Sequence, residues 1–402
     1  MATQNVNFER TLLSTNSDAN TRDMAMTIFS GMVLESFQTA SVFYDRAGEF
    51  MSIKQLNGAA SAQWPIIGND PFGSYHMPGT FINEQSAQGT NDKRIQMYQK
   101  TITTDEYLVN GLDIPFTDMN VLHFDVVGPF ATKLGRNLAK ILDRKIAILA
   151  TKASLSAAVS DVYAAGMQVN RTGSATIASA YPASPQGAYN FRVDLATLAQ
   201  KFDEASIPES GRYLFITPAI KTALRFEPAF NNAVSSAAVW YPQSTTASGS
   251  TSYVGGTSVQ AAPSQYTSGS SPSDIASRVI GNLEGFQFVV TNNLPSTNLD
   301  QASLTGEDAA VVYTSTVTSG TGGKYQINAT GGSSGANPKP VAVALCSAAT
   351  GSPAIGMVQA TGLQTHMEDD QRRNTKFLKA QLMCGLDVLC PWSAGSITIT
   401  AS

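Results

Sequence analysis

The stretch HFDVVGPFATKLGRNLAKILDRKIAILATKASL, residues 123–155, decides the fold. Its apolar side chains recur every three or four residues, which is the pattern of an amphipathic α-helix. These apolar positions are Phe130, Leu134, Leu138, Ile141, Ile146 and Leu149. A second set of positions, also three or four residues apart, is basic: Lys133, Arg136, Lys140 and Arg144. The sequence therefore predicts one long helix with an apolar stripe and a separate basic stripe.

The residues before this helix predict a shorter helix and an extended ribbon. Residues 1–22 are polar and suit a loosely ordered arm. Phe29, Val33 and Phe37 recur every four residues, which predicts a helix that ends near Ala40. Residues 51–104 are predicted to form a long two-stranded ribbon without an obvious buried face. Such a ribbon is only marginally stable alone, so we expect it to pack on something else, for example another copy of the chain.

The residues after the long helix predict a mixed module of helices and strands. VDLATLAQKFDEASIP, residues 193–208, predicts a helix, and residues 211–226 predict a strand, a turn at Pro218 and another helix. The Ser/Thr/Gly-rich residues 231–273 predict a long surface insertion, and residues 296–340 have a similar composition. From about residue 341 the strand patterns return.

The stretch IGNLEGFQFVVTNNLP, residues 280–295, could be mistaken for a nucleotide-binding loop because it contains two glycines. In a dinucleotide fold, however, the glycines follow a strand and precede a helix. Here they precede a predicted strand that has Phe286, Phe288 and Val290 on one face. The stretch therefore predicts a tight turn that leads into a strand of the framework.

Composition narrows the class of protein. The chain has 402 residues, only 14% of which are charged, against roughly 25% in typical soluble domains. The formal net charge of −4 argues against a chain that is basic overall, although a local basic face remains possible. The three cysteines form no even disulfide framework and predict reduced thiols. We expect a soluble chain without a membrane span or a secretory signal, made inside the cell.

The residues that carry enzyme chemistry are sparse, and we predict no catalytic, cofactor or metal site. His76, His123 and His366 lie far apart in the sequence, and nothing near them suggests a catalytic partner. GGSSG at residues 331–335 fits the nucleophile pattern G-x-S-x-G, but ANPKP follows it where a helix is required. Cys384 and Cys390 lack further ligands nearby, which argues against a zinc site.

Two charged groups remain as interaction candidates. Glu368, Asp369 and Asp370 precede Arg372 and Arg373, and such a run is usually a solvated face or a set of ion pairs. If the chain assembles, these ion pairs could form between subunits. The basic stripe of the long helix could contact nucleic acid or a neighbouring subunit, and a solvated face is its equally weighted alternative.

Several segments, taken in order, resemble the major capsid protein of tailed bacteriophages of the short-tailed, podovirus type. The N-terminal segments are FSGMVLESFQTASVF from Phe29, GAASAQWPIIG from Gly58 and DMNVLHFDVVGPFATKLGRNLAKILDRKIAILA from Asp118. The later segments are EGFQFVVTNNLP from Glu284 and AIGMVQATGLQTHMEDDQRRNTKFLKAQLMCGLDVLCP from Ala354. Together they span most of the chain. The two Ser/Gly-rich stretches lie outside the resemblance.

The resemblance implies an α+β tailed-phage capsid fold with an arm, an extended loop, a peripheral domain that contains the long "spine" helix, and an axial domain. The implied divisions are 1–50 for the arm and first helix, 51–117 for the extended loop, 118–190 for the peripheral domain, 191–345 for the axial domain with the insertion at 231–273, and 346–402 for the return to the peripheral domain and the C-terminal strands.

The resemblance also implies a structural, non-enzymatic virion protein without cofactors. Copies of it would self-assemble into hexamers and pentamers of an icosahedral capsid around double-stranded DNA, which they would contact non-specifically. The implied partners are other copies, a scaffolding protein, a portal at one vertex and a decoration or cement protein, with no membrane. Synthesis would take place in the cytoplasm of a bacterial host. The alternative is an encapsulin-like bacterial nanocompartment, which would enclose cargo enzymes.

Overall fold

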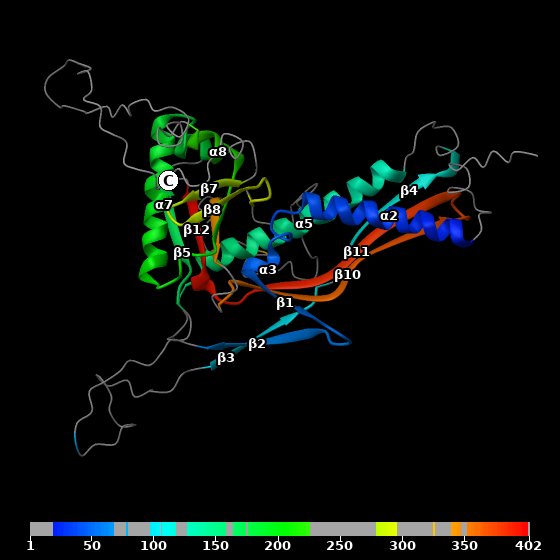
Figure 1. Cartoon of the computed structure of the whole chain (residues 1–402), viewed down its shortest axis with the longest axis horizontal. Coiled ribbons are helices and arrows are strands. Elements are labelled where there is room, and N and C mark those ends of the chain that lie inside the picture. The colour runs from blue at the N-terminus through cyan, green and yellow to red at the C-terminus, as the bar shows by residue number, and fades with distance from the viewer. Residues whose placement is uncertain are drawn as a thin grey trace, which may run out of the picture.

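The computed structural model describes residues 19–67, 78, 97–105, 107–117, 127–157, 164–173, 176–225, 279–295, 325, 339–346 and 352–400. Its strands form a four-stranded sheet, a six-stranded sheet and a two-stranded ribbon. The long helix predicted from the sequence is α5 (Val127–Leu155), and it runs from one larger sheet to the other (Figure 1).

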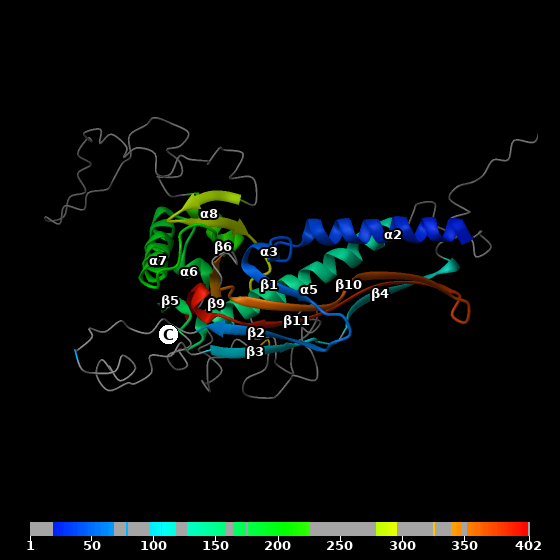
Figure 2. The same ribbon diagram turned by 60° about the horizontal axis from the view of Figure 1, so that its bottom comes forward.

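The four-stranded sheet has the order β1-β10-β11-β4. It consists of β1 (Met51–Gln55), β10 (Ile355–Asp370), β11 (Thr375–Val388) and β4 (Leu108–Pro115). β1 pairs with β10 in parallel, and the other pairs are antiparallel. Helices α2 (Ala19–Ala40) and α5 lie on one side of β10 and β11 (Figure 2). Side chains along β11 therefore alternate between buried and half-buried positions.

Helices α2 and α5 pack closely against one another. Phe29, Val33 and Phe37 of α2 are buried in the shared core, which confirms the predicted apolar face of this helix. A Cβ atom at Gly135 of α5 would collide with the Ser36 hydroxyl and the backbone of Val33. Glycine at this position thus permits the close approach of the two helices.

The six-stranded sheet has the order β5-β12-β9-β6-β8-β7. Its strands are β5 (Met167–Thr172), β12 (Ala394–Thr400), β9 (Lys339–Cys346), β6 (Arg212–Ile216), β8 (Phe286–Val290) and β7 (Val279–Leu283). Helices α7 (Pro185–Glu204) and α8 (Pro218–Leu224) pack on one face. The C-terminal half of α5 and the short helix α3 (Ala47–Phe50) pack on the other. Because both faces are covered, all five residues of β6 are buried.

Short elements complete the connections around this sheet. The single-turn helix α6 (Ile177–Ala180) precedes α7, and the 3₁₀ turn η5 (Pro391–Ser393) links β11 to β12. The sequence boundary proposed at residues 190–191 falls inside α7. Strands β5, β9 and β12 come from three different predicted segments but share one sheet, and each contributes side chains to the core that this sheet forms with α7.

The hairpin β7–β8 contains the glycine-rich stretch singled out in the sequence. Glu284 and Gly285 form its two-residue turn with positive φ values of 50° and 80°, as a type I′ hairpin turn requires. Phe286 and Phe288 are buried and Val290 is half-buried, which confirms the predicted apolar face. Gly281 differs from the prediction, because it lies within β7 and not in the turn.

A buried carboxylate joins three parts of the fold. Asp143 of α5 is fully buried, and its Oδ2 accepts hydrogen bonds from Val42 N at 2.7 Å and Asn293 Nδ2 at 3.1 Å. Its Oδ1 accepts from Phe43 N at 3.1 Å and Tyr44 N at 3.2 Å. Burial raises the pKa of this carboxyl to about 6, against the opposing effect of the four hydrogen bonds. The side chain thereby fixes the α2–α3 connection and the residues after β8 to α5.

Replacing Asp143 by Asn is expected to lower the free energy of unfolding by about 1–3 kcal/mol at pH 7.5, because an amide nitrogen would face two N–H donors. The folded carboxyl keeps its proton up to about pH 6, whereas the unfolded one releases it near 3.8. This difference should remove about 3 kcal/mol of wild-type stability as the pH rises through that window. The difference in the free energy of unfolding between wild type and Asp143→Asn should therefore be larger at pH 4.5 than at pH 7.5.

Urea titrations of the unassembled chain at these pH values measure the effect. Asp45→Asn is the matched control, because Asp45 is an exposed carboxylate in the same α2–α3 connection. If the free energy of unfolding of Asp143→Asn differed from that of wild type by the same amount at both pH values, this account of the buried carboxylate would be contradicted.

Candidate functional site

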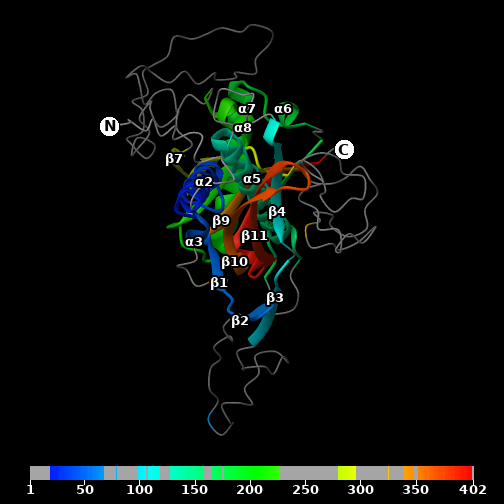
Figure 3. The ribbon, with the colours of Figure 1, turned by 90° about the vertical axis from the view of Figure 1, so that its right-hand side faces the viewer.

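The ribbon is a separate pair of strands outside the two larger sheets. Strands β2 (Ser61–Ile67) and β3 (Met97–Thr103) pair with each other and, among the described strands, with no other. Figures 2 and 3 show them beneath β10 and β11, on the side away from α2.

One face of the ribbon packs on its own chain. Trp64, Ile66 and Ile102 are 6%, 4% and 1% exposed and form a small core with Val358 and Leu389. No buried face of the ribbon is obvious in the sequence, but these strands have one, and the expected packing on another element is provided by the same chain. The sequence concealed this face because the partner residues lie about 250 to 325 positions further along the chain.

Polar contacts reinforce this packing. Trp64 Nε1 donates a hydrogen bond to Ser52 Oγ at 2.9 Å. The Lys54 ammonium lies 4.5 Å from the centroid of the Trp64 ring and donates to the carbonyl oxygen of Gln63. Lys100 forms an ion pair with Asp387 at 3.1 Å. Apolar, cation–π and ionic contacts together thus hold the ribbon on the rest of the chain.

Two glycines of the four-stranded sheet allow the ribbon to lie this close. A Cβ atom at Gly356 would lie 2.6 Å from Cδ1 of Ile102. A Cβ atom at Gly385 would collide with the carbonyl oxygen of Thr103, which is a backbone atom and cannot rotate away. The ribbon can therefore lie in this position only because β10 and β11 have glycine, without a side chain, at these two places.

The opposite face of the ribbon is exposed. Gln63, Pro65, Gln99 and Thr101 lie on it, and Met97 at its end is 69% exposed. This face carries no charge, so covering it with another protein surface would not require the desolvation of an ion.

Further apolar side chains are exposed in pairs elsewhere. Tyr107 and Val109, 51% and 48% exposed, lie at the free edge of β4. Tyr189 and Val193, 59% and 43% exposed, lie one turn apart on α7. Single exposed apolar residues are common, but neighbouring pairs on an edge strand and a helix face favour contact with another protein.

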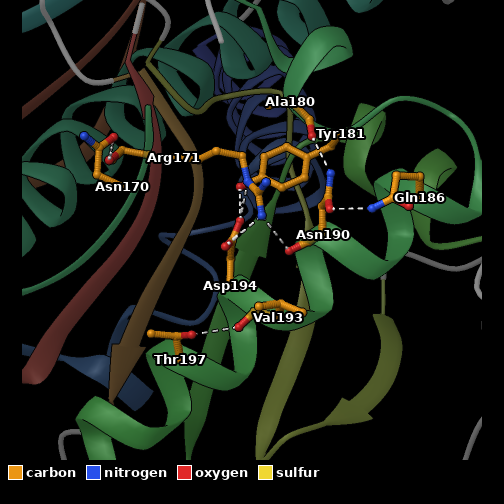
Figure 4. A network of polar contacts seen from close by, with 10 residues as sticks. Asn170, Arg171, Ala180, Tyr181, Gln186, Asn190, Val193, Asp194 and Thr197 are labelled. Carbon is orange, nitrogen blue, oxygen red and sulfur yellow. Dashed lines mark hydrogen bonds and ion pairs between the residues drawn. The ribbon is translucent and has the colours of Figure 1, made fainter. Parts of the chain in front are cut away.

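A polar network lies under the exposed face of α7 (Figure 4). Arg171 of β5 donates two hydrogen bonds to Asp194, at 2.9 and 3.0 Å, and one to the Asn190 carbonyl at 3.2 Å. The Tyr181 hydroxyl donates to Asp194 at 2.7 Å, and the Arg171 guanidinium lies over its ring. Burial and this hydrogen bond raise the pKa of Tyr181. Each of these groups has a partner, so the network fastens edge strand β5 to α7 and offers no reactive group.

The side chains of the basic stripe predicted on α5 become less exposed toward the C-terminal end of the helix. Lys133 and Arg136 are exposed, whereas Lys140 and Arg144 are half-buried. The first two residues are accessible to a phosphate backbone or to a neighbouring subunit.

The charged run lies at the tip of the β10–β11 hairpin. Asp370 accepts hydrogen bonds from the backbone N–H groups of Arg372 and Arg373 and forms an ion pair with the Arg373 side chain. Asp369 pairs with the buried Lys376 at 3.2 Å. These contacts lie within one chain. Glu368 and Arg372 are exposed and have no ion-pair partner among the described residues, so inter-subunit pairing by this group stays a prediction.

The sites considered for enzyme chemistry find no support in the described part of the chain. His366 is exposed on β10, and its ring lies 3.5 Å from the Gln381 amide. Burial raises the pKa of the Cys346 and Cys390 thiols to about 12, which disfavours the reactive thiolate. Residues 331–335, His76 and His123 lie outside the described residues. No described cluster of His, Cys, Asp and Glu could hold a metal ion, and no described helix has the length and apolarity of a membrane span.

Solved structures share this arrangement. The capsid structure of the cyanophage P-SCSP1u superposes with a TM-score of 0.57 at 20% identity, covering 90% of this chain and 89% of that one. The mature capsid of bacteriophage PhiM1 superposes with a TM-score of 0.56 at 13% identity, covering 89% and 87% of the two chains. No family model and no curated protein matches the sequence. The chain thus has the fold of phage capsid proteins, as its segments predicted.

Replacing Gly385 by Ala is expected to push the ribbon root away from β11, at a cost of about 1–3 kcal/mol, because the new methyl group meets backbone atoms. Protease cleavage of the ribbon should become several-fold faster, which time-resolved proteolysis with mass spectrometry measures. Gly362→Ala is the matched control, because its methyl group would meet only the Gln359 amide at 3.5 Å. Equal cleavage rates in the two variants would contradict the role given to Gly385.

Proposed function

We propose that this chain is the shell-forming major capsid protein of a tailed bacteriophage of the short-tailed type. The observation that carries the proposal is the fold, which matches phage capsid structures over about nine-tenths of both chains. The ordered sequence segments that resemble podovirus-type capsid proteins support the finer assignment. In this proposal the protein has a structural role and no enzymatic one.

The mechanism is repeated contact between copies, which build hexamers and pentamers of an icosahedral shell. The uncharged outward face of the ribbon is the surface that we assign to a neighbouring subunit. The apolar pairs at the β4 edge and on α7 supply two further contact points. A low content of charge suits such a shell, because strong like charge would oppose the packing of many identical copies.

The same proposal assigns partners beyond the chain itself. Double-stranded DNA inside the shell would be contacted non-specifically, with Lys133 and Arg136 as the exposed cations of α5. A scaffolding protein, a portal at one vertex and a decoration or cement protein are the further partners. The protein would be made in the bacterial cytoplasm and would function in the virion.

Shortening the ribbon tests the assembly role. Ile67 and Met97 are cross-strand partners, so a short Gly-containing turn between them can replace residues 68–96 and leave β2, β3 and their small core in place. We expect a folded subunit, with wild-type circular dichroism, that forms no regular shells in electron microscopy. Wild-type chain expressed with and without a scaffolding protein is the reference. Normal shells from the shortened chain would contradict the assembly role of the ribbon.

Neutralising the exposed cations tests the DNA contact. Lys133→Gln with Arg136→Gln is expected to leave shells intact but to lower their nucleic-acid content at least about twofold, measured by absorbance at 260 and 280 nm. Arg225→Gln, which removes an exposed cation after α8, is the control. Failure of shell formation would instead place the stripe between subunits. Wild-type shells that carry protein cargo and no DNA would favour the encapsulin-like alternative.

A further inference from the structure

A buried polar cluster lies where the ribbon joins the body of the protein. Asp105 follows the end of β3 by two residues and is 6% exposed. Its carboxylate accepts a hydrogen bond from the hydroxyl of Tyr325 and lies 3.9 Å from the Lys145 ammonium of α5. The same ammonium lies 5.0 Å from the centroid of the Tyr325 ring. One side chain from each of three distant chain segments therefore meets in a space closed to solvent.

The burial of Tyr325 is unexpected from the sequence. It belongs to the Ser/Gly-rich residues 296–340, whose composition is similar to that of the predicted surface insertion at 231–273, yet its side chain is 0% exposed. Burial, followed by the Asp105 charge, raises its pKa well above 10, so the hydroxyl stays a donor at physiological pH. A completely buried tyrosine in such a stretch indicates that the chain is fastened to the core at this point.

The cluster lies at the point where the orientation of the ribbon relative to the body is set. The ribbon joins the body through two short connections at its root, and there the backbone N–H of Thr104 donates to the Ala60 carbonyl at 3.0 Å. Asp105 is the next residue, and its own N–H donates to the carbonyl of Cys384 at 3.3 Å. A rotation of the ribbon about this root must move Asp105. Such a movement would separate its carboxylate from Lys145 and Tyr325 and leave buried polar groups with poorer partners.

We infer that Asp105, Tyr325 and Lys145 form a latch that holds the ribbon root in one orientation on α5. The contacts of Trp64, Lys100 and Ile102 hold the strands of the ribbon against β10 and β11. The latch adds directional hydrogen bonding and charge at the point about which the ribbon turns. This property belongs to the single subunit and does not depend on shell formation.

The test removes one hydroxyl from the latch and one from a matched site. Tyr325→Phe removes the hydrogen bond to Asp105 and keeps the ring over Lys145. Tyr181→Phe removes a hydrogen bond from a buried tyrosine to Asp194 in the network of Figure 4, on the far side of the six-stranded sheet. Hydroxyl-radical footprinting of the unassembled full chain, read by mass spectrometry, reports on two buried residues. Trp64 reports on the ribbon, and Phe191 on the Tyr181 network.

Tyr325→Phe is expected to raise the reactivity of Trp64 about tenfold and to leave Phe191 unchanged, whereas Tyr181→Phe should do the reverse. Lys145→Met, which keeps an apolar chain beside the Tyr325 ring, should also expose Trp64. The latch is refuted if Trp64 stays protected in both latch variants. A parallel rise at Trp64 and Phe191, or loss of the helical circular dichroism signal in both variants, also overturns it, because either result makes the cluster a general support of the fold.

Discussion

The constraint on which the structure depends is that a single helix must be buried by two sheets at once. α5 has 29 residues, and 17 of them are buried, although an amphipathic surface helix would bury only one stripe. Its N-terminal half lies between α2 and the four-stranded sheet, and its C-terminal half lies against the six-stranded sheet. A polar residue on the buried part of this helix therefore needs a partner, and Asp143, Lys145 and Ser154 each have one. Those three contacts join the helix to the α2–α3 connection, to the ribbon root and to β12.

The elements that sequence periodicity predicted are those whose apolar spacing is complete within a single element. The α2 face, the strand–turn–helix at residues 211–226 and the apolar face of β8 follow from spacings within a few turns or strands. The buried face of the ribbon could not be predicted this way, because Trp64 and Ile102 pack on residues near positions 358 and 389. Tyr325 was missed for a related reason. Its neighbours in sequence are mostly polar or glycine, and its burial follows from remote residues, the core around α5 together with Asp105 and Lys145.

The candidate interaction surfaces divide in the same way. The basic spacing on α5 was visible in the sequence, but its gradient from exposed Lys133 to half-buried Arg144 depends on the tertiary packing of the helix. The charged run at residues 368–373 was visible too, yet Asp369, Asp370 and Arg373 are engaged within the chain by hairpin geometry that composition does not encode. The uncharged outward face of the ribbon emerges only once the inward face is known. In this chain with few charges, the candidate contact surfaces are thus recognised by their lack of charge more than by charged residues that could form ion pairs.

The parallel pairing of β1 with β10 has a consequence for how the chain folds during synthesis. Met51 lies opposite Ile355, so strands about 300 residues apart must meet before the four-stranded sheet is complete. At translation rates of roughly 5–20 residues per second, β1 waits about 15–60 s for its partner. The apolar faces of α2 and α5 lack their sheet during this interval, and contacts so distant in sequence form slowly once both strands are available. Nascent chains on neighbouring ribosomes therefore expose surfaces that can associate wrongly, which makes protection of the growing chain as important to yield as the stability of the finished subunit.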